Sequence, residues 1–415
     1  MTSISGSDQT IKIALDTKQL QLHWLLQITK AINYNLPSAN LFDIYLTVLK
    51  DQLHVSKIIL LVNEEGWRIP VSFGVDEKIP FATPTFFAGE IQQLSEHNSS
   101  SNPWLKQFET IIPVLHNQVP LAYALIGGVD DKVFHSRREV ITYIHTITNL
   151  IVVAIENKRL TQESINQAAM EREMELAAQM QSMLFPASIA SHPLMDIAAT
   201  YIPHQSVGGD YYDFIPLNET ESLVCMADVS GKGISAALLM SNFQANLHAL
   251  IKHTHSTLEQ LIVELNNCVN RSARGEKFIT FFIGKINNLT HTIQYINAGH
   301  NPPMVIHNHE IRMLDQGTTG LGMFDELPFL HIGEEEFPPG ALLFCYTDGI
   351  TEMENKNGVV LGPDHLGGLL LRHRGVETMQ LLHEIMVQSF DDFRQEMDLN
   401  DDVTFLSLRF SKKAE

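Results

Sequence analysis

An apolar run, LVCMA at residues 223–227, passes directly into the polar turn DVSGKG at residues 228–233. An apolar run that ends in a glycine-rich turn predicts a buried strand whose last residues lie at a sheet edge, where functional groups are commonly presented. Gly231 and Gly233 permit a tight turn from this strand into a helix. Asp228 is therefore the first candidate functional residue.

Three more acidic clusters lie beside apolar runs in the C-terminal half of the chain. They are GGDYYD at 208–213, TDG at 347–349 and NDD at 400–402. Carboxylates that converge on one edge repel one another strongly unless cations lie between them. No matching His or Cys spacing accompanies the clusters, so the pattern favours Mg²⁺ or Mn²⁺, which prefer oxygen ligands. Two such ions, ~3.5–4 Å apart, can activate water for in-line attack on a phosphoryl group.

The composition limits the cellular setting and the class of partner. The 415 residues, 44% of them hydrophobic, suggest two or three globular domains. A formal net charge of −20 disfavours nucleic acid and anionic membrane surfaces as partners. Cys225, Cys268 and Cys345 are far apart in sequence, which predicts free thiols in a reducing, cytoplasmic compartment. We find neither a signal-peptide pattern nor an uncharged apolar run of the ~18 residues that a membrane span needs.

The N-terminal part predicts an α+β domain at residues 18–155, preceded by a flexible polar arm at residues 1–17. A helical pattern at 20–53 is interrupted at 35–40, and residues 76–108 are irregular. Four apolar runs with turn signals between them predict strands at 57–62, 67–73, 110–115 and 121–126.

Residues 136–184 contain no proline or glycine and predict one long helix. Isoleucines at 144, 147, 151 and 155 are spaced three or four residues apart, and Leu176, Met180 and Met183 repeat this spacing after a polar middle. The pattern favours a coiled-coil linker at residues 156–185 that makes the chain a parallel dimer. The alternative is two ordinary helices, each packed on its own domain. Beyond Pro186, residues 186–412 predict a second domain in which strands alternate with two amphipathic helical segments.

The motifs of the C-terminal domain resemble the metal-dependent protein phosphatases of the PPM (protein phosphatase 2C-like) superfamily. The resemblance is to the bacterial branch typified by sporulation stage II protein E and the sigma-factor regulator phosphatases. The motifs are GGDYYDF at 208–214, ADVSGKGISAALLM at 227–240, FITFFIG at 278–284, NAGHNPPM at 297–304, TTGLGMF at 318–324, PPGALLFCYTDGITE at 338–352 and DDVTFL at 401–406.

This resemblance implies an αββα sandwich with two Mn²⁺ or Mg²⁺ ions at one edge and a set of expected ligands. By matching motif, Asp228 would bridge the ions, helped by the Val229 backbone carbonyl. Asp348 and Asp401 would bind one ion and Asp210 the other, directly or through a water, while Asp402 could exchange roles with Asp401. The resemblance also makes Asp228, Asp348 and Asp401 the expected catalytic residues.

Three further residues in these motifs are candidates for structural or chemical roles. Asp213 is expected to be a structural hydrogen-bond acceptor. Lys232 could meet phosphate or could be a solvated lysine, and His300 could be a general acid or could stabilise its turn.

The N-terminal domain resembles a GAF domain by its order of helices and strands, which implies a sensory or dimerising role with a small molecule or protein as its signal. The whole chain is then expected to remove phosphate from phosphoserine or phosphothreonine on a regulatory protein, by family an anti-sigma-factor antagonist. One alternative is a two-metal nuclease or nucleotide hydrolase, which the acidity and the lack of a basic groove disfavour. Another is a non-catalytic signalling scaffold, which the retained carboxylates disfavour.

Overall fold

The computed structural model describes residues 6–64, 66–75, 104–129, 136–186, 194–253 and 257–410. Contacts divide the chain into two units, Met1–Ala168 and Ala169–Glu415. The division falls inside the stretch 156–185, for which the sequence predicts a linker. Much of the irregular stretch 76–108 lies outside the described residues.

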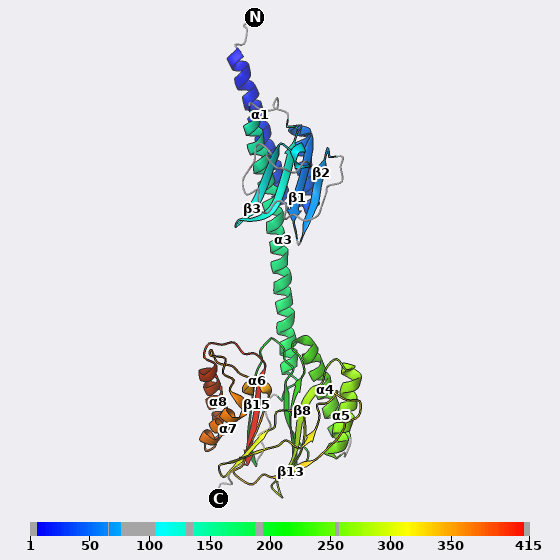
Figure 1. The fold of residues 1–415 in the computed structure, drawn as a ribbon, viewed down its shortest axis with the longest axis vertical. Coiled ribbons are helices and arrows are strands. Elements are labelled where there is room, and N and C mark those ends of the chain that lie inside the picture. Colours follow the sequence, from blue (N-terminus) through cyan, green and yellow to red (C-terminus); the bar gives the residue numbers. More distant parts are fainter. Residues whose placement is uncertain are drawn as a thin grey trace. The chain divides into compact units, whose positions relative to one another are not determined.

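The first unit is built on a four-stranded antiparallel sheet with strand order β2-β1-β4-β3 (Figure 1). The four predicted strands are present, as β1 (Lys57–Asn63), β2 (Trp67–Phe73), β3 (Thr110–His116) and β4 (Val119–Gly127). Alternate residues of β1 pack on opposite faces. Ile58, Leu60 and Val62 join the core formed with the helices, whereas Ile59 and Leu61 join a second cluster around Phe108.

The helices of this unit are α1 (Gly6–Asn33), α2 (Ser38–Thr47) and the first part of α3 (Arg137–Ser182), with a π-helical turn at Val48–Gln52 and a 3₁₀ turn at Leu105–Gln107. Within the predicted flexible arm at residues 1–17, the described residues 6–17 are instead helical, because α1 begins at Gly6. No proline or glycine lies between Gly6 and Pro37 to interrupt the helix. The predicted break at 35–40 is confirmed, with Asn35 at a positive φ of 52°.

The long helix α3 is continuous over 46 residues, but its first apolar stripe is used inside the chain. Ile144, Ile147, Ile151 and Ile155 are buried in the core of the first unit instead of forming a seam for a partner helix. Lys158, which interrupts the stripe, donates to the carbonyls of Asn35 (3.3 Å) and Leu36 (3.1 Å), just beyond the end of α1. These two hydrogen bonds explain why a lysine, and not an apolar residue, occupies position 158.

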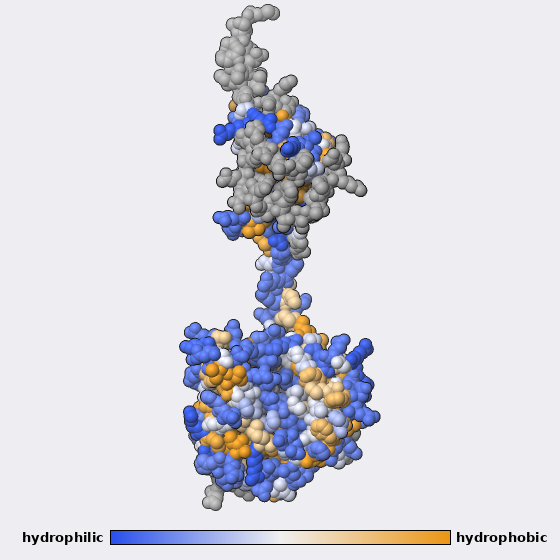
Figure 2. All heavy atoms as spheres, viewed as in Figure 1, coloured by the Kyte–Doolittle hydropathy of each residue, from blue (hydrophilic) through white to orange (hydrophobic). Residues whose placement is uncertain are grey.

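The apolar composition of α3 also bears on membranes. By length and composition alone, α3 could cross a membrane, because one 18-residue window of it is sufficiently apolar. The sequence pattern predicts no membrane span, because no run of this length is both uncharged and apolar throughout. Half of that window is buried, as expected for a helix whose isoleucines pack in a protein core. Residues 161–173 are exposed, and the surface in Figure 2 is predominantly hydrophilic along the middle of the helix.

The second unit contains two sheets that pack face to face. One sheet has the order β11-β10-β14-β15-β5, and the other has the order β12-β9-β8-β7-β6, with β13 paired to β9. Their strands are β5 (Met195–Ile202), β6 (Tyr211–Pro216), β7 (Glu221–Val229), β8 (Ile279–Asn287), β9 (Thr292–Ala298), β10 (Met304–His307), β11 (Glu310–Met313), β12 (Gly317–Thr318), β13 (Gly333–Glu336), β14 (Leu342–Tyr346) and β15 (Val403–Phe410). The predicted hairpin at 278–297 is β8 and β9, which pair up to Asn287 and Thr292.

Helices cover the outside of both sheets, which gives the αββα layering (Figure 1). Helices α4 (Ile234–His253) and α5 (Leu258–Ala273) pack on the sheet that contains β7, and α7 (Gly362–His373) and α8 (Met379–Arg394) pack on the sheet that contains β14. The sequence pattern predicts only two helical segments in this domain. Gly362, Pro363 and the pair Gly367-Gly368 are turn signals that obscure the helical pattern of α7.

The sequence boundary at residue 186 is placed too late. Phe185 is 8% exposed and belongs to the core of the second unit, and Leu184 packs against that core. Gln181, still within α3, is also buried in this unit. The end of α3 is thus an integral part of the second unit. All three cysteines are free thiols, as predicted, and Cys225 and Cys345 are buried.

Candidate metal centre

The predicted aspartates come together at one end of the two sheets. Asp228 lies at the end of β7, and Asp210 immediately precedes β6, its antiparallel neighbour. Asp348 is the first residue of the short helix α6 (Asp348–Thr351), which follows β14. Asp401 and Asp402 immediately precede β15, which pairs with β14. The residues therefore come from both sheets of the sandwich.

Asp210 joins the two sheets through hydroxyl groups that the sequence analysis did not identify. Its side chain is buried, and Oδ2 accepts hydrogen bonds from Thr347 Oγ1 (2.9 Å) and from the hydroxyl of Thr404. The backbone N–H of Thr347 in turn donates to the carbonyl of Thr404 (3.0 Å). Thr347 adjoins Asp348 and Thr404 is two residues from Asp402. A single threonine next to a strand has no distinctive sequence pattern, so the sequence does not predict these contacts.

The carboxylates are close enough to perturb one another. Burial, followed by the charges of Asp348 and Asp401, raises the pKa of Asp228 to about 7. Burial and then the charge of Asp228 raise the pKa of Asp210 well above its ordinary value. The pKa of Asp348 is also raised, first by burial and then by Glu352 and Asp401. These mutual effects show that Asp210, Asp228, Asp348 and Asp401 form one electrostatic cluster.

Asp401 and Asp402 have different surroundings. Asp402 is 7% exposed, and its two oxygens accept backbone hydrogen bonds from His204 (2.8 Å) and Gly209 (3.0 Å). The side chain of Asp401 is 37% exposed and forms an ion pair with Lys232, with Nζ 2.7 Å from Oδ2. Asp402 thus fixes the backbone of two residues with its two oxygens, whereas Asp401 forms an exposed ion pair with Lys232 and accepts the neighbouring Asp402 N–H at Oδ1 (2.9 Å). Lys232 also donates to the carbonyl of Asn400, so it is not simply solvated.

The candidate ligands are carboxylate and carbonyl oxygens, which are the ligands that a hard divalent cation prefers. In the part of the chain that the structure describes, no three His, Cys, Asp or Glu side chains are grouped to hold a metal ion. The backbone of Gly209 lies close to the Val229 carbonyl, one of the predicted metal-binding groups: a Cβ at Gly209 would lie 2.9 Å from that carbonyl oxygen. The oxygen donors are of the kind that Mg²⁺ or Mn²⁺ prefers.

Asp213 and His300 have structural surroundings. Asp213 accepts hydrogen bonds from Tyr211 (2.7 Å), His248 (2.8 Å) and the Phe214 backbone (2.7 Å), which confirms the predicted acceptor role. The His300 backbone N–H donates to Asn297 Oδ1 (2.7 Å). Burial lowers the pKa of His300 to about 4, so this imidazole is neutral near pH 7. Turn stabilisation therefore describes His300 better than general-acid chemistry does.

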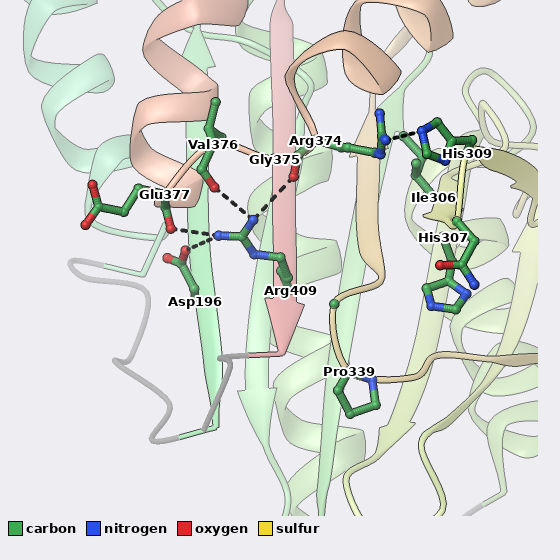
Figure 3. A pocket seen from close by; sticks show the side chains of 12 residues that line it. Asp196, Ile306, His307, His309, Pro339, Arg374, Gly375, Val376, Glu377 and Arg409 are labelled. Carbon is green, nitrogen blue, oxygen red and sulfur yellow. Dashed lines mark hydrogen bonds and ion pairs between the residues drawn. The ribbon is translucent and has the colours of Figure 1, made fainter. Parts of the chain in front are cut away.

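A cavity of about 670 Å³ lies at the opposite end of β5 and β15 from the aspartates (Figure 3). Arg409 donates there to the carbonyls of Val376 (2.9 Å) and Glu377 (2.8 Å) and pairs with Asp196 (3.5 Å). These interactions attach the loop between α7 and α8 to the sheet. Arg409 therefore has a structural role. The cavity that it lines is remote from the acidic cluster.

Comparisons with known proteins agree with this architecture. Residues 218–411 match the family model of stage II sporulation protein E. Over 247 residues the chain is 29% identical to phosphoserine phosphatase RsbU of Bacillus subtilis, covering 59% of this chain and 71% of that protein. It is 26% identical over 186 residues to phosphoserine phosphatase RsbP of the same organism, covering 44% of this chain and 46% of that protein.

A solved structure provides an independent comparison of the fold. The PP2C domain of SiaA from Pseudomonas aeruginosa superposes with a TM-score of 0.53 at 19% sequence identity, covering 59% of this chain and 99% of that domain. At this identity the likeness concerns the fold alone. The αββα unit described above is thus the part of the chain that resembles known PP2C domains.

Proposed function

We propose that this chain, whose C-terminal domain belongs to the SpoIIE/PP2C family of metal-dependent serine/threonine phosphatases, hydrolyses phosphoserine or phosphothreonine on a regulatory protein. The observation that carries the proposal is the convergence of Asp210, Asp228, Asp348 and Asp401 at one end of the sandwich, where burial and mutual repulsion raise the pKa of Asp228 to about 7. Such a cluster is costly to a fold and is typical of a site that binds cations.

The expected roles follow from the surroundings of each residue. Asp228 and the Val229 carbonyl would bridge two Mn²⁺ or Mg²⁺ ions, with Asp348 and Asp401 on one ion and Asp210 on the other. When bound, the ions would supply charge neutralisation and an activated water for attack at phosphorus. Thr347 and Thr404 would keep the Asp210 carboxylate oriented. Asp402 would position the backbone of Gly209 and His204, so Asp401 is the better candidate for the direct ligand.

The substrate is proposed from the named relatives and from the motifs. RsbU and RsbP are both named phosphoserine phosphatases, which supports a phosphoserine-bearing substrate. The resemblance to sigma-factor regulator phosphatases makes a phosphorylated anti-sigma-factor antagonist the specific candidate. With free thiols and a net charge of −20, the chain is proposed to act in the cytoplasm.

The first unit is proposed to be a GAF-like domain that controls the phosphatase, with α3 forming the interface of a parallel homodimer. Its support is the four-stranded sheet flanked by α1 and α3, and the exposed apolar residues near the end of α3. Leu176 and Met180 are 46% and 71% exposed and lie four residues apart on one helix face. Sedimentation of the full chain at micromolar concentration tests the dimer. The parent should sediment as a dimer and a Leu176→Glu, Met180→Glu variant as a monomer; a monomeric parent would refute it.

The catalytic proposal is tested by hydrolysis of a phosphorylated anti-sigma-factor antagonist in Mn²⁺, Mg²⁺ or EDTA. We expect turnover only with a divalent ion. Asp228→Asn should abolish turnover while the protein still unfolds cooperatively, because the amide removes a charge shared by both ions. Gln179→Ala, on an exposed position of α3, is the matched control. Full activity in EDTA, or undiminished hydrolysis by Asp228→Asn, would contradict the two-metal site.

A further inference from the structure

We infer that Gln181, in the last turn of α3, is a positioning residue for the metal centre, because its side-chain amide holds the Gly208–Gly209 turn that precedes Asp210. The inference rests on the proposed function and adds a residue that no motif or neighbour assigns to it. Gln181 itself need not touch substrate or metal. It acts through the backbone of the turn.

The contact is a reciprocal pair of hydrogen bonds. Gln181 Nε2 donates to the carbonyl oxygen of Gly208 (2.7 Å), and the Gly208 N–H donates to Gln181 Oε1 (3.2 Å). Gln181 is 6% exposed, so neither hydrogen bond competes freely with water. A primary amide offers one donor and one acceptor in the same plane, and it therefore satisfies both polar groups of a single backbone residue.

Asp402 and Tyr201 also lie against the Gly208–Gly209 turn. A Cβ at Gly208 would lie only 2.0 Å from Asp402 Oδ2 and 2.3 Å from the hydroxyl of Tyr201. The Gly209 N–H donates to the same Asp402 oxygen (3.0 Å), and Asp210 follows directly. Gly208 is thus fixed between the Gln181 amide and the Asp402 carboxylate. Displacement of the turn would shift Asp210 and would disturb the hydrogen bond that orients Asp402.

Apolar packing fixes the position of Gln181 relative to this turn. Phe185, four residues later, is buried, and its ring lies 4.9 Å from that of Tyr201 and 5.1 Å from that of Tyr212. Tyr201 ends near Gly208, and Tyr212 lies two residues beyond Asp210. The chain therefore contacts the surroundings of Asp210 at two points, through the Gln181 hydrogen bonds in the last turn of α3 and through Phe185 three residues beyond its end. Rotation of the last turn of α3 would separate the amide from Gly208, which gives this helix a direct connection to the site.

The test compares full-length parent, Gln181→Met and the exposed control Gln179→Met. Methionine keeps the length of the side chain but neither donates to Gly208 O nor accepts from Gly208 N. Isothermal titration calorimetry with Mn²⁺ and the Mn²⁺ dependence of phosphatase activity are measured together with thermal unfolding in EDTA. We expect Gln181→Met to weaken Mn²⁺ binding by about tenfold, the lower end of losses seen when groups supporting ligands are removed. Gln179→Met should match the parent.

The outcomes separate a positioning role from a merely structural one. If Gln181→Met lowers the melting temperature but binds Mn²⁺ like the parent, Gln181 only stabilises the fold and the inference is overturned. If it does not fold, Gln181→Asn, which keeps the amide but is one methylene too short, takes its place with the same expected loss of Mn²⁺ affinity. A parent that binds no Mn²⁺ overturns the proposed function and this inference together. A parent that binds Mn²⁺ more tightly than Gln181→Met but releases no phosphate overturns only the proposed function.

Discussion

Replacing Gly349 by alanine should disable the proposed metal centre although alanine is the better residue for a helix. Gly349 lies in α6 directly after Asp348, and a Cβ there would be 2.0 Å from the backbone oxygen of Asp402. Real Cβ atoms essentially never come within 3.0 Å of another atom, so the segment at 401–402 must move by about 1 Å relative to Asp348. A misplacement of about 1 Å can reduce catalysis ~100-fold, which corresponds to about 2.7 kcal/mol. Overpacking should also lower stability by ~1–3 kcal/mol.

The assay is kcat/KM for Mn²⁺-dependent dephosphorylation, with urea unfolding of the same preparations. Gly368→Ala is the matched control, because Gly368 lies in α7 with no atom within 4 Å of its would-be Cβ. That variant should keep full activity and gain up to ~1 kcal/mol of stability from the helix propensity of alanine. Parental activity of Gly349→Ala would refute the reasoning, since it would mean that the spacing between Asp348 and Asp402 does not matter.

Two further predictions concern stability. Burial lowers the pKa of His383 to about 3, below its ordinary value of about 6.5, so the unfolded chain binds this proton more tightly. The stability that this neutral histidine contributes is fully present above about pH 6.5 and is lost as the pH falls toward 3, by on the order of 4 kcal/mol. In urea unfolding, the free energy of unfolding of His383→Gln should therefore depend less steeply on pH between pH 7 and 4 than that of the parent. An equally steep dependence in both proteins would contradict the assignment. A fragment of residues 176–415 should unfold at a higher temperature than a fragment of residues 190–415, because the shorter fragment lacks the core residue Phe185. The loss of this side chain is comparable to a Phe→Ala change in a core, which costs ~3–5 kcal/mol. Equal melting temperatures would show that Phe185 contributes little.

The convergence of the aspartates was predictable because each one adjoins an apolar run. Runs such as LVCMA become central strands, so the residues beside them are brought to the end of a sheet. The ligand roles themselves stay a prediction. The supporting contacts had no such local signal: Gln181 is 27 residues from Gly208, and Thr404 is 194 residues from Asp210.

The differences between prediction and structure at the N-terminal side have a common physical origin. Periodicity reports that one face of a helix is apolar, but it does not report what covers that face. The isoleucines of α3 were compatible with a partner helix, yet they pack on β1 and the other elements of their own unit. Likewise, the polar start of α1 concealed a helix, because the absence of proline and glycine proved more informative than composition.

The two edge strands of the first sheet, β2 and β3, each carry a proline, Pro70 and Pro113. Both strands also pair with their neighbours through an irregular register. A proline withholds an amide donor, and a bulge twists the edge, so neither strand offers an intact template on which a strand of another molecule could add. Two copies of this domain would therefore not merge into a continuous intermolecular sheet. Among the described residues of this unit, self-association is then left to side chains, such as those of its helices, where single substitutions can change it.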